Sequence, residues 1–110
     1  MTDPVILYIT VQNRDEGIKI GRALVDENLA ACANVFDGLT SIFRWEGAVQ
    51  EDGEALLVAK TDRTLIDAAT DLVKLEHSYD CPCVVAIPIV GGNQQFIDWI
   101  GEETTGADAE

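Results

Sequence analysis

The chain has 110 residues, 47% of them hydrophobic, which predicts a single domain whose core would leave a monomer only marginally stable. Twenty acidic residues face seven basic ones, for a net charge of −13, and this excludes the basic surface that nucleic-acid binding requires. The charge is compatible with cation binding, although a solvated acidic surface explains it as well. No apolar run approaches the about 18 residues of a membrane span, and residues 5–11 lack the basic flank of a signal peptide. We therefore expect a cytoplasmic protein without a membrane partner.

The first strand and the first helix follow directly from the apolar pattern. Residues 4–11 (PVILYITV) are apolar on both faces, which predicts a central strand. Asn13 is a suitable cap for a following helix, and Glu16 stands three residues later, as in a capping box. Gly21 lies on the apolar face of that helix, so we expect close packing against a sheet.

A long hairpin follows. Residues 29–36 and 39–45 form one arm, interrupted by a bulge or bend at Asp37 and Gly38. Residues 48–61 return after a short turn. The two arms are longer than a small sheet can use, so we expect the excess to protrude or to pair with another chain.

The second half of the chain repeats the alternation. Asp62 caps a second helix that ends near His77, and residues 83–90 form a fourth strand that is apolar on both faces apart from its proline. Asn93 caps a short third helix. Residues 102–110 are expected to form a disordered acidic tail.

The order strand, helix, strand, strand, helix, strand, with one added helix, predicts an α+β fold: a ferredoxin-like βαββαβ sandwich in one domain of residues 1–101. Its four-stranded antiparallel sheet carries two helices on one face. A partner subunit is expected to cover the other face, because the hairpin is long and the chain is short.

The segment around Cys81 and Cys83 raises the question of a metal site. It follows His77, the only histidine, and Glu76 or Asp80 could join the same group. Thiolate and imidazole are good ligands for zinc or cuprous copper, but structural zinc sites usually separate two cysteines by two to four residues. Alternatively, the thiols are small buried hydrophobes. A disulfide between them is disfavoured, because its ring would be small and the compartment reducing.

Three further residues have competing interpretations. Cys32 lies among small apolar residues, and we expect it to be buried packing. Lys60 ends an apolar strand and either reaches solvent or meets a carboxylate in a cleft, where it could contact an anion. Trp45 either packs at a subunit interface or forms the wall of a cleft.

Five segments together resemble the CutA divalent-ion tolerance proteins. These are residues 22–34 (RALVDENLAACAN), 38–47 (GLTSIFRWEG), 56–61 (LLVAKT), 77–83 (HSYDCPC) and 98–100 (DWI). The resemblance covers residues 5–100 in order. It implies a compact homotrimer of ferredoxin-like subunits, with long hairpins that pair between subunits, and an association with tolerance to copper and other divalent cations.

The resemblance also implies where a site would lie. The family gathers polar and aromatic residues in the clefts between subunits, and the corresponding ligand-cleft residues here are Lys60, His77, Tyr79, Trp45 and Glu46. The proposed copper ligands of the family correspond to Ile9, Glu76 and Cys83. Because an alkyl group cannot bind metal, the family site is not carried over intact. It has been exchanged for a softer set of Cys83, Cys81, His77 and Glu76, or it has been lost, and we favour its loss.

Three functions compete at this point. The first is a trimeric divalent-cation tolerance protein that binds copper, zinc or another divalent metal. The second is a regulatory trimer that senses a small ligand and resembles the nitrogen-signalling regulators. The third is an enzyme, which we do not expect: Arg14 occupies the loop where ferredoxin-like acylphosphatases carry an arginine, but acids follow it, and one histidine supports no catalytic triad.

Overall fold

A computed structural model describes residues 2–105. Its elements in chain order are β1 (Pro4–Val11), α1 (Arg14–Asp26), β2 (Cys32–Trp45), β3 (Ala48–Asp62), a short 3-10 helix η1 (Arg63–Leu65), α2 (Ile66–Glu76), β4 (Val84–Pro88) and α3 (Gln94–Thr105). This order confirms the expected ferredoxin-like α+β fold with an added C-terminal helix. None of the helices in residues 2–105 is long and apolar enough to cross a bilayer.

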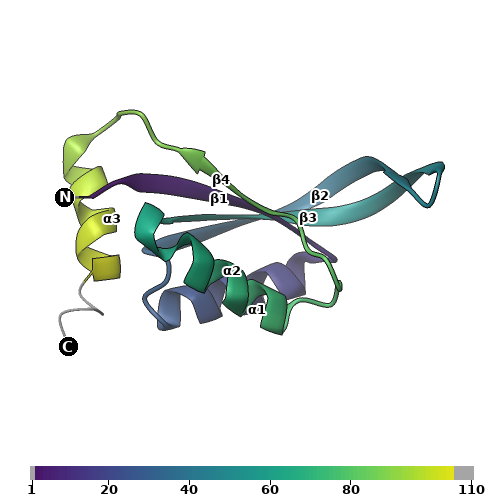
Figure 1. Ribbon diagram of the computed structural model, residues 1–110, viewed down its shortest axis with the longest axis horizontal. Coiled ribbons are helices and arrows are strands. Elements are labelled where there is room, and N and C mark those ends of the chain that lie inside the picture. The colour runs from purple at the N-terminus through teal and green to yellow at the C-terminus, as the bar shows by residue number, and fades with distance from the viewer. Residues whose placement is uncertain (1, 106–110) are drawn as a thin grey trace.

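The four strands form one antiparallel sheet in the order β2-β3-β1-β4. Figure 1 shows α1 and α2 together on one side of this sheet, α3 at the end near the N-terminus, and the β2–β3 hairpin projecting away from all three helices. β1 is central, as predicted. The face without α1 and α2 is therefore open along most of its length.

The core lies between the sheet and the first two helices. Along β1 the burial alternates, so that Leu7 and Ile9 are fully buried while Tyr8 between them is not. Such alternation is the mark of a strand with one covered face. A Cβ atom added to Gly21 would lie 3.1 Å from Leu57 Cδ1, which confirms that this glycine lets α1 approach the sheet closely.

The hairpin contains both features that its sequence predicted. The register between β2 and β3 shifts between Phe36 and Leu39, as a bulge requires. At the tip, Glu46 and Gly47 have φ angles of 50° and 81°. Two consecutive residues with positive φ define a type I′ turn, whose twist matches that of the flanking strands.

β4 differs from the expected fourth strand. It is an edge strand of five residues, shorter than the predicted range 83–90, and in the single chain its Val85 and Ile87 are about half exposed. Pro88 ends it, because a proline cannot donate a ladder hydrogen bond and is confined to such edges.

The third helix extends farther than predicted. Residues 102–105, assigned to the acidic tail, continue α3, because Thr104 is fully buried and donates a hydrogen bond from Oγ1 to Ile100 O at 2.8 Å. Residues 106–110 of the predicted tail lie outside the described residues. Asn93 begins the helix as expected, since its Oδ1 accepts from Gln95 N at 3.1 Å.

Candidate functional site

His77 lies in the loop after α2, and both of its ring nitrogens have protein partners. Nε2 is 2.8 Å from Thr10 O, and because a carbonyl only accepts, Nε2 carries the proton. Nδ1 accepts from Tyr79 N at 3.0 Å. The imidazole is also buried. With its donor and its acceptor both occupied, this ring joins the loop to β1 and offers no free nitrogen to a metal.

Glu16 ties the same loop to α1. Its Oε1 accepts from Gln12 N at 2.8 Å and its Oε2 from Ser78 N at 2.9 Å. Oε1 is also 3.7 Å from His77 Nδ1. Partial burial raises the pKa of the Glu16 carboxyl group. The hydrogen bonds from Gln12 and Ser78 lower this pKa, as does the electrostatic effect of the His77 ring. Together they outweigh the burial, so the net pKa lies below its usual value.

Tyr79 extends this cluster to the hairpin. Its hydroxyl donates to Glu54 Oε2 at 2.8 Å, and its ring lies 4.6 Å from the His77 ring between centroids. Burial, the bond to Glu54 and the charges of nearby acids raise the pKa of the Tyr79 hydroxyl well above its usual range. Tyr79 therefore remains a neutral donor. The His77 and Tyr79 side chains thus lie next to each other in the loop after α2.

Lys60 lies elsewhere on the sheet. It is directly opposite Cys32 on β2, and its Nζ donates to Asn34 Oδ1 at 2.6 Å and lies 3.7 Å from Cys32 Sγ. The protein groups that the amine contacts are thus an amide oxygen and a thiol, not the carboxylate of one alternative. Cys32 is also only partly buried, because strand alternation turns it to the face that α1 leaves open. In the single chain Cys32 is therefore not the fully buried packing residue that was predicted.

Trp45 and Glu46 do not join the other ligand-cleft residues within one chain. Both lie at the tip of the hairpin, and the Trp45 side chain is 59% exposed. From Ala48, which pairs with Trp45, to Lys60 the strand β3 runs twelve residues, or roughly 40 Å. One chain therefore holds the predicted cleft as three separate parts.

The predicted metal ligands are likewise separate. Within residues 2–105 no group of three or more His, Cys, Asp and Glu side chains is arranged to hold a metal ion. Glu76 lies 3.5 Å from Lys19 Nζ, and Ile9 is fully buried in the core. Cys81 and Cys83 are both exposed free thiols in the loop before β4. Being exposed in the single chain, they are not the small buried hydrophobes of the alternative interpretation.

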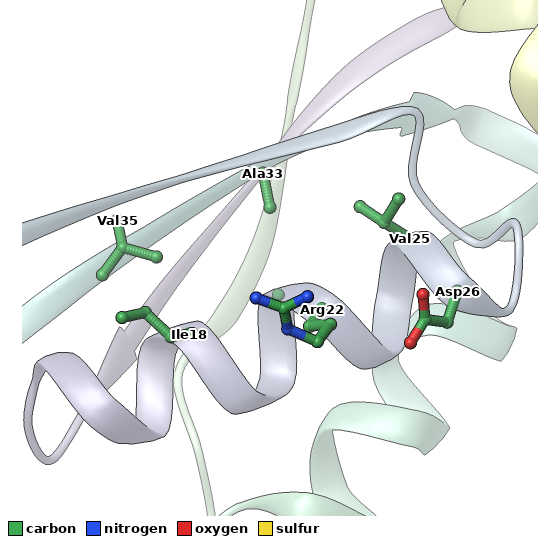
Figure 2. A pocket seen from close by; sticks show the side chains of 7 residues that line it. Ile18, Arg22, Val25, Asp26, Ala33 and Val35 are labelled. Atoms are coloured by element: carbon green, nitrogen blue, oxygen red, sulfur yellow. The ribbon is translucent and has the colours of Figure 1, made fainter.

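Open cavities lie on the surface of the described residues. One, of about 330 Å³, lies between α1 and β2, and Figure 2 shows Ile18, Arg22 and Asp26 projecting from the helix beside Ala33 and Val35 of the strand. None of the predicted site residues lines it. The second, of about 320 Å³, lies between α3 and the sheet and is almost entirely apolar; the predicted cleft residue that lines it is Lys60.

The topology and the projecting hairpin define a class of ferredoxin-like proteins that solved structures already represent. The crystal structure of CutA1 from Oryza sativa superposes with a TM-score of 0.90 at 42% identity, covering 94% of each chain. The structure of the divalent cation tolerance protein from Thermus thermophilus gives a TM-score of 0.90 at 44% identity, covering 92% of this chain and 98% of that one.

The sequence comparisons agree. The family model described as CutA1 divalent ion tolerance protein matches residues 5–103. The chloroplastic protein CutA 1 of Oryza sativa is 43% identical over 91% of this chain, which spans 56% of that relative's length. The Thermus thermophilus divalent-cation tolerance protein CutA is 44% identical over 90% of this chain and 96% of its own. The chain belongs to the CutA1 family.

Sequence reasoning missed three polar partners. Glu16 was identified only as part of a helix cap, and Glu54 and Asn34 received no role. Each acts on a residue 25 to 62 positions away, so no local pattern indicated the contact.

Proposed function

We propose that this chain acts as a homotrimeric divalent-cation tolerance protein in the cytoplasm and that it has no catalytic activity. Its membership of a family described by divalent-ion tolerance supports the proposal. The regulatory trimer considered as an alternative gains no support from the comparisons, since the relatives described above are all CutA proteins.

The observation that carries the trimer is the exposed apolar surface of the hairpin and of the β4 edge. Large apolar side chains of the hairpin and of the β4 edge are about half exposed or more in the single chain, namely Phe36, Ile42, Trp45, Val49, Val85 and Ile87. Exposed large apolar side chains on a long hairpin and an unpaired strand edge are a liability unless another chain covers them. Further copies of the same chain would supply matching hairpins and edges.

The assembly is tested by light scattering coupled to size-exclusion chromatography. We expect a particle of three times the 11.9 kDa chain mass that resists dilution to low micromolar concentration. Ile42→Glu should break it, because a charge buried at an interface without a partner is costly. Leu75→Glu is the matched control, since Leu75 is exposed on α2, away from the hairpin. A monomeric wild type would refute the proposal.

The sequence favoured loss of the family's metal site, but because both thiols are exposed we propose further that copper or zinc binds at Cys81 and Cys83. Two considerations support these two residues over the larger predicted set. Both thiols are free and exposed. His77 and Glu76, by contrast, already have protein partners. Thiolates favour soft ions such as cuprous copper. Water or a second subunit would have to complete the coordination.

Calorimetric titration with cuprous copper and with zinc, under reducing conditions, tests the thiol site. Wild type should bind with micromolar or tighter affinity, and Cys81→Ser/Cys83→Ser should lose at least tenfold in that affinity. Cys32→Ser is the matched single-thiol control and should bind as wild type does. Equal binding by the double variant would instead place any cation on the general acidic surface.

A further inference from the structure

The contacts of His77 fit only the neutral form of its ring. Nε2 donates to Thr10 O at 2.8 Å, and Nδ1 accepts from Tyr79 N at 3.0 Å. A protonated imidazole has two donors and no acceptor. A second proton, on Nδ1, would therefore face the N–H group of Tyr79, and the hydrogen bond between the ring and Tyr79 could not persist.

A carboxylate stands beside the same ring nitrogen. Glu16 Oε1 lies 3.7 Å from His77 Nδ1, which is long for a hydrogen bond but close enough to attract a charged ring. The His77 side chain is fully buried, whereas that of Glu16 is 12% exposed. A buried imidazolium is costly unless it has a partner of opposite charge, and Glu16 is placed to be that partner.

The other charged groups near the ring are already engaged. The acidic groups that face His77 or its neighbour Tyr79 are Glu16 of α1, Glu76 of α2, and Glu54 and Asp52 of β3. Glu76 pairs with Lys19 at 3.5 Å. Glu54 accepts from the Tyr79 hydroxyl at 2.8 Å. β1, which supplies Thr10 O, contains no charged residue. Glu16 is therefore the charge that a proton on Nδ1 would meet.

Tyr79 is attached at both of its ends while the ring is neutral. Its backbone N–H donates to His77 Nδ1, and its hydroxyl donates to Glu54 on the hairpin. Loss of the first bond would leave Tyr79 bonded to the hairpin through its hydroxyl alone. The bond from His77 Nε2 to Thr10 O would be unaffected, because that nitrogen carries a proton in both states of the ring.

We propose that His77 is a proton-operated switch: when the ring takes up its second proton, Nδ1 exchanges its bond from Tyr79 N for an ion pair with Glu16, and the loop is released at Tyr79. Histidine is the side chain that ordinarily changes charge between about pH 5 and 8. The switch goes beyond the proposed tolerance function and does not depend on it. It requires no open surface, because the ring and its partners all belong to one chain.

Nuclear magnetic resonance of the assembled wild-type protein tests the exchange. Because His77 is the only histidine, the signals of its ring nitrogens are unambiguous. One ring nitrogen should carry a proton at about pH 8, and both should at about pH 5. Over the same range the hydrogen-exchange protection of the Tyr79 amide, corrected for the intrinsic pH dependence of exchange, should fall about tenfold, as the loss of one hydrogen bond predicts.

The Ser78 amide is the internal control. It donates to Glu16 Oε2, and because the pKa of Glu16 is lowered, this acceptor stays charged at about pH 5. The Ser78 amide should therefore keep the protection that the Tyr79 amide loses. Unchanged protection of Tyr79, or a ring that keeps a single proton until the protein unfolds, would overturn the proposal. Equal losses at the two amides would also refute it, since they would show a general loosening of the loop.

Two variants separate the switch from a general effect of acid. In His77→Gln the amide can donate to Thr10 O and accept from Tyr79 N but cannot take up a proton, so the protection of the Tyr79 amide should not depend on pH. Glu76→Gln is the matched control, since its carboxylate pairs with Lys19, and it should switch as wild type does. A pH-dependent loss of protection in His77→Gln would contradict the assignment. Because the wild-type measurement is decisive alone, a folding defect in a variant would not rescue the proposal.

Discussion

Glu16 connects segments that are far apart in the sequence. Its backbone N–H donates to the Asn13 side chain at 2.9 Å and so caps α1, while its carboxylate receives Gln12 N and Ser78 N. The loop that carries His77 and Ser78 is therefore held by a charge as well as by packing. These hydrogen bonds stabilise the charged carboxylate and so lower the pKa of Glu16.

Glu16→Gln should lower the free energy of unfolding at pH 7 by about 1–3 kcal/mol, because one carboxylate acceptor becomes an amide donor that cannot accept from Gln12 N or Ser78 N, and the other acceptor loses its charge. A carboxyl group whose pKa is lowered by folding stabilises the native state above its unfolded pKa, and this stabilisation is lost as the pH falls through the folded pKa. The curves of wild type and variant should therefore converge below about pH 4.5. Urea unfolding across this range provides the measurement.

Glu102→Gln is the control for that experiment, since Glu102 is an exposed carboxylate on α3. It should shift the unfolding curves little at any pH. A Glu16→Gln variant whose deficit stayed constant down to pH 3 would show that the carboxylate contributes by shape and not by charge.

At the scale of the element, the β2–β3 hairpin shows how local chemistry determines a large structure. Its tip requires two consecutive residues with positive φ, and the sequence supplies Glu46 and Gly47. Glycine adopts this region freely, whereas glutamate does so at a cost. Glu46 was predicted to be a ligand-cleft residue. Within one chain it instead occupies a strained turn position at the exposed tip of the hairpin.

Glu46→Asn should stabilise the turn by roughly 0.5–1 kcal/mol, since asparagine tolerates positive φ and Asn-Gly is the preferred type I′ pair. Gly47→Ala should destabilise it by about 1–2 kcal/mol for the opposite reason. Thermal unfolding of the two variants at one protein concentration measures both effects. Equal melting temperatures would indicate that the tip frays and contributes nothing to global stability.

At the scale of the whole molecule, the excess of acidic over basic residues is the dominant electrostatic feature. Within residues 2–105 two ion pairs involve lysine or arginine, Lys19 with Glu76 at 3.5 Å and Arg63 with Asp3 at 3.6 Å, and both are largely exposed. Exposed pairs of this kind contribute little. They cannot offset a net charge of −13, and an assembly of several chains would multiply that charge.

Sodium chloride should therefore raise the melting temperature, because screening reduces the repulsion more than it weakens the two exposed pairs. The effect should appear mainly between low ionic strength and about 0.5 M, where the Debye length falls below the spacing of surface charges. Scanning calorimetry over this range measures it, with an uncharged osmolyte as the control for exclusion effects. A flat salt response would indicate that bound cations already neutralise the acids.

Most of the fold was predictable because it depends on local signals. The capping residues Asn13 and Asn93 both lie where helices begin, and Gly21 packs against the sheet as its place on the apolar face implied. Caps, turns and alternation act over a few residues, so a single sequence displays them. The helical course of residues 102–105 was missed, because the burial of Thr104 depends on α3 docking at the end of the sheet.

The sequence by itself determined the order of the elements, the long hairpin and the family, since periodicity, turn residues and motifs are properties of neighbouring positions. Only the tertiary structure decided which side chains remain available for chemistry. His77 changed from a candidate ligand to a ring with both nitrogens occupied, while Cys32 changed from packing to the partner of Lys60. His77 Nδ1 accepts from Tyr79 N two residues away, but the contacts of His77 Nε2 and of Cys32 join residues 67 and 28 positions apart. Such contacts follow from strand register and helix packing, which the whole chain establishes together.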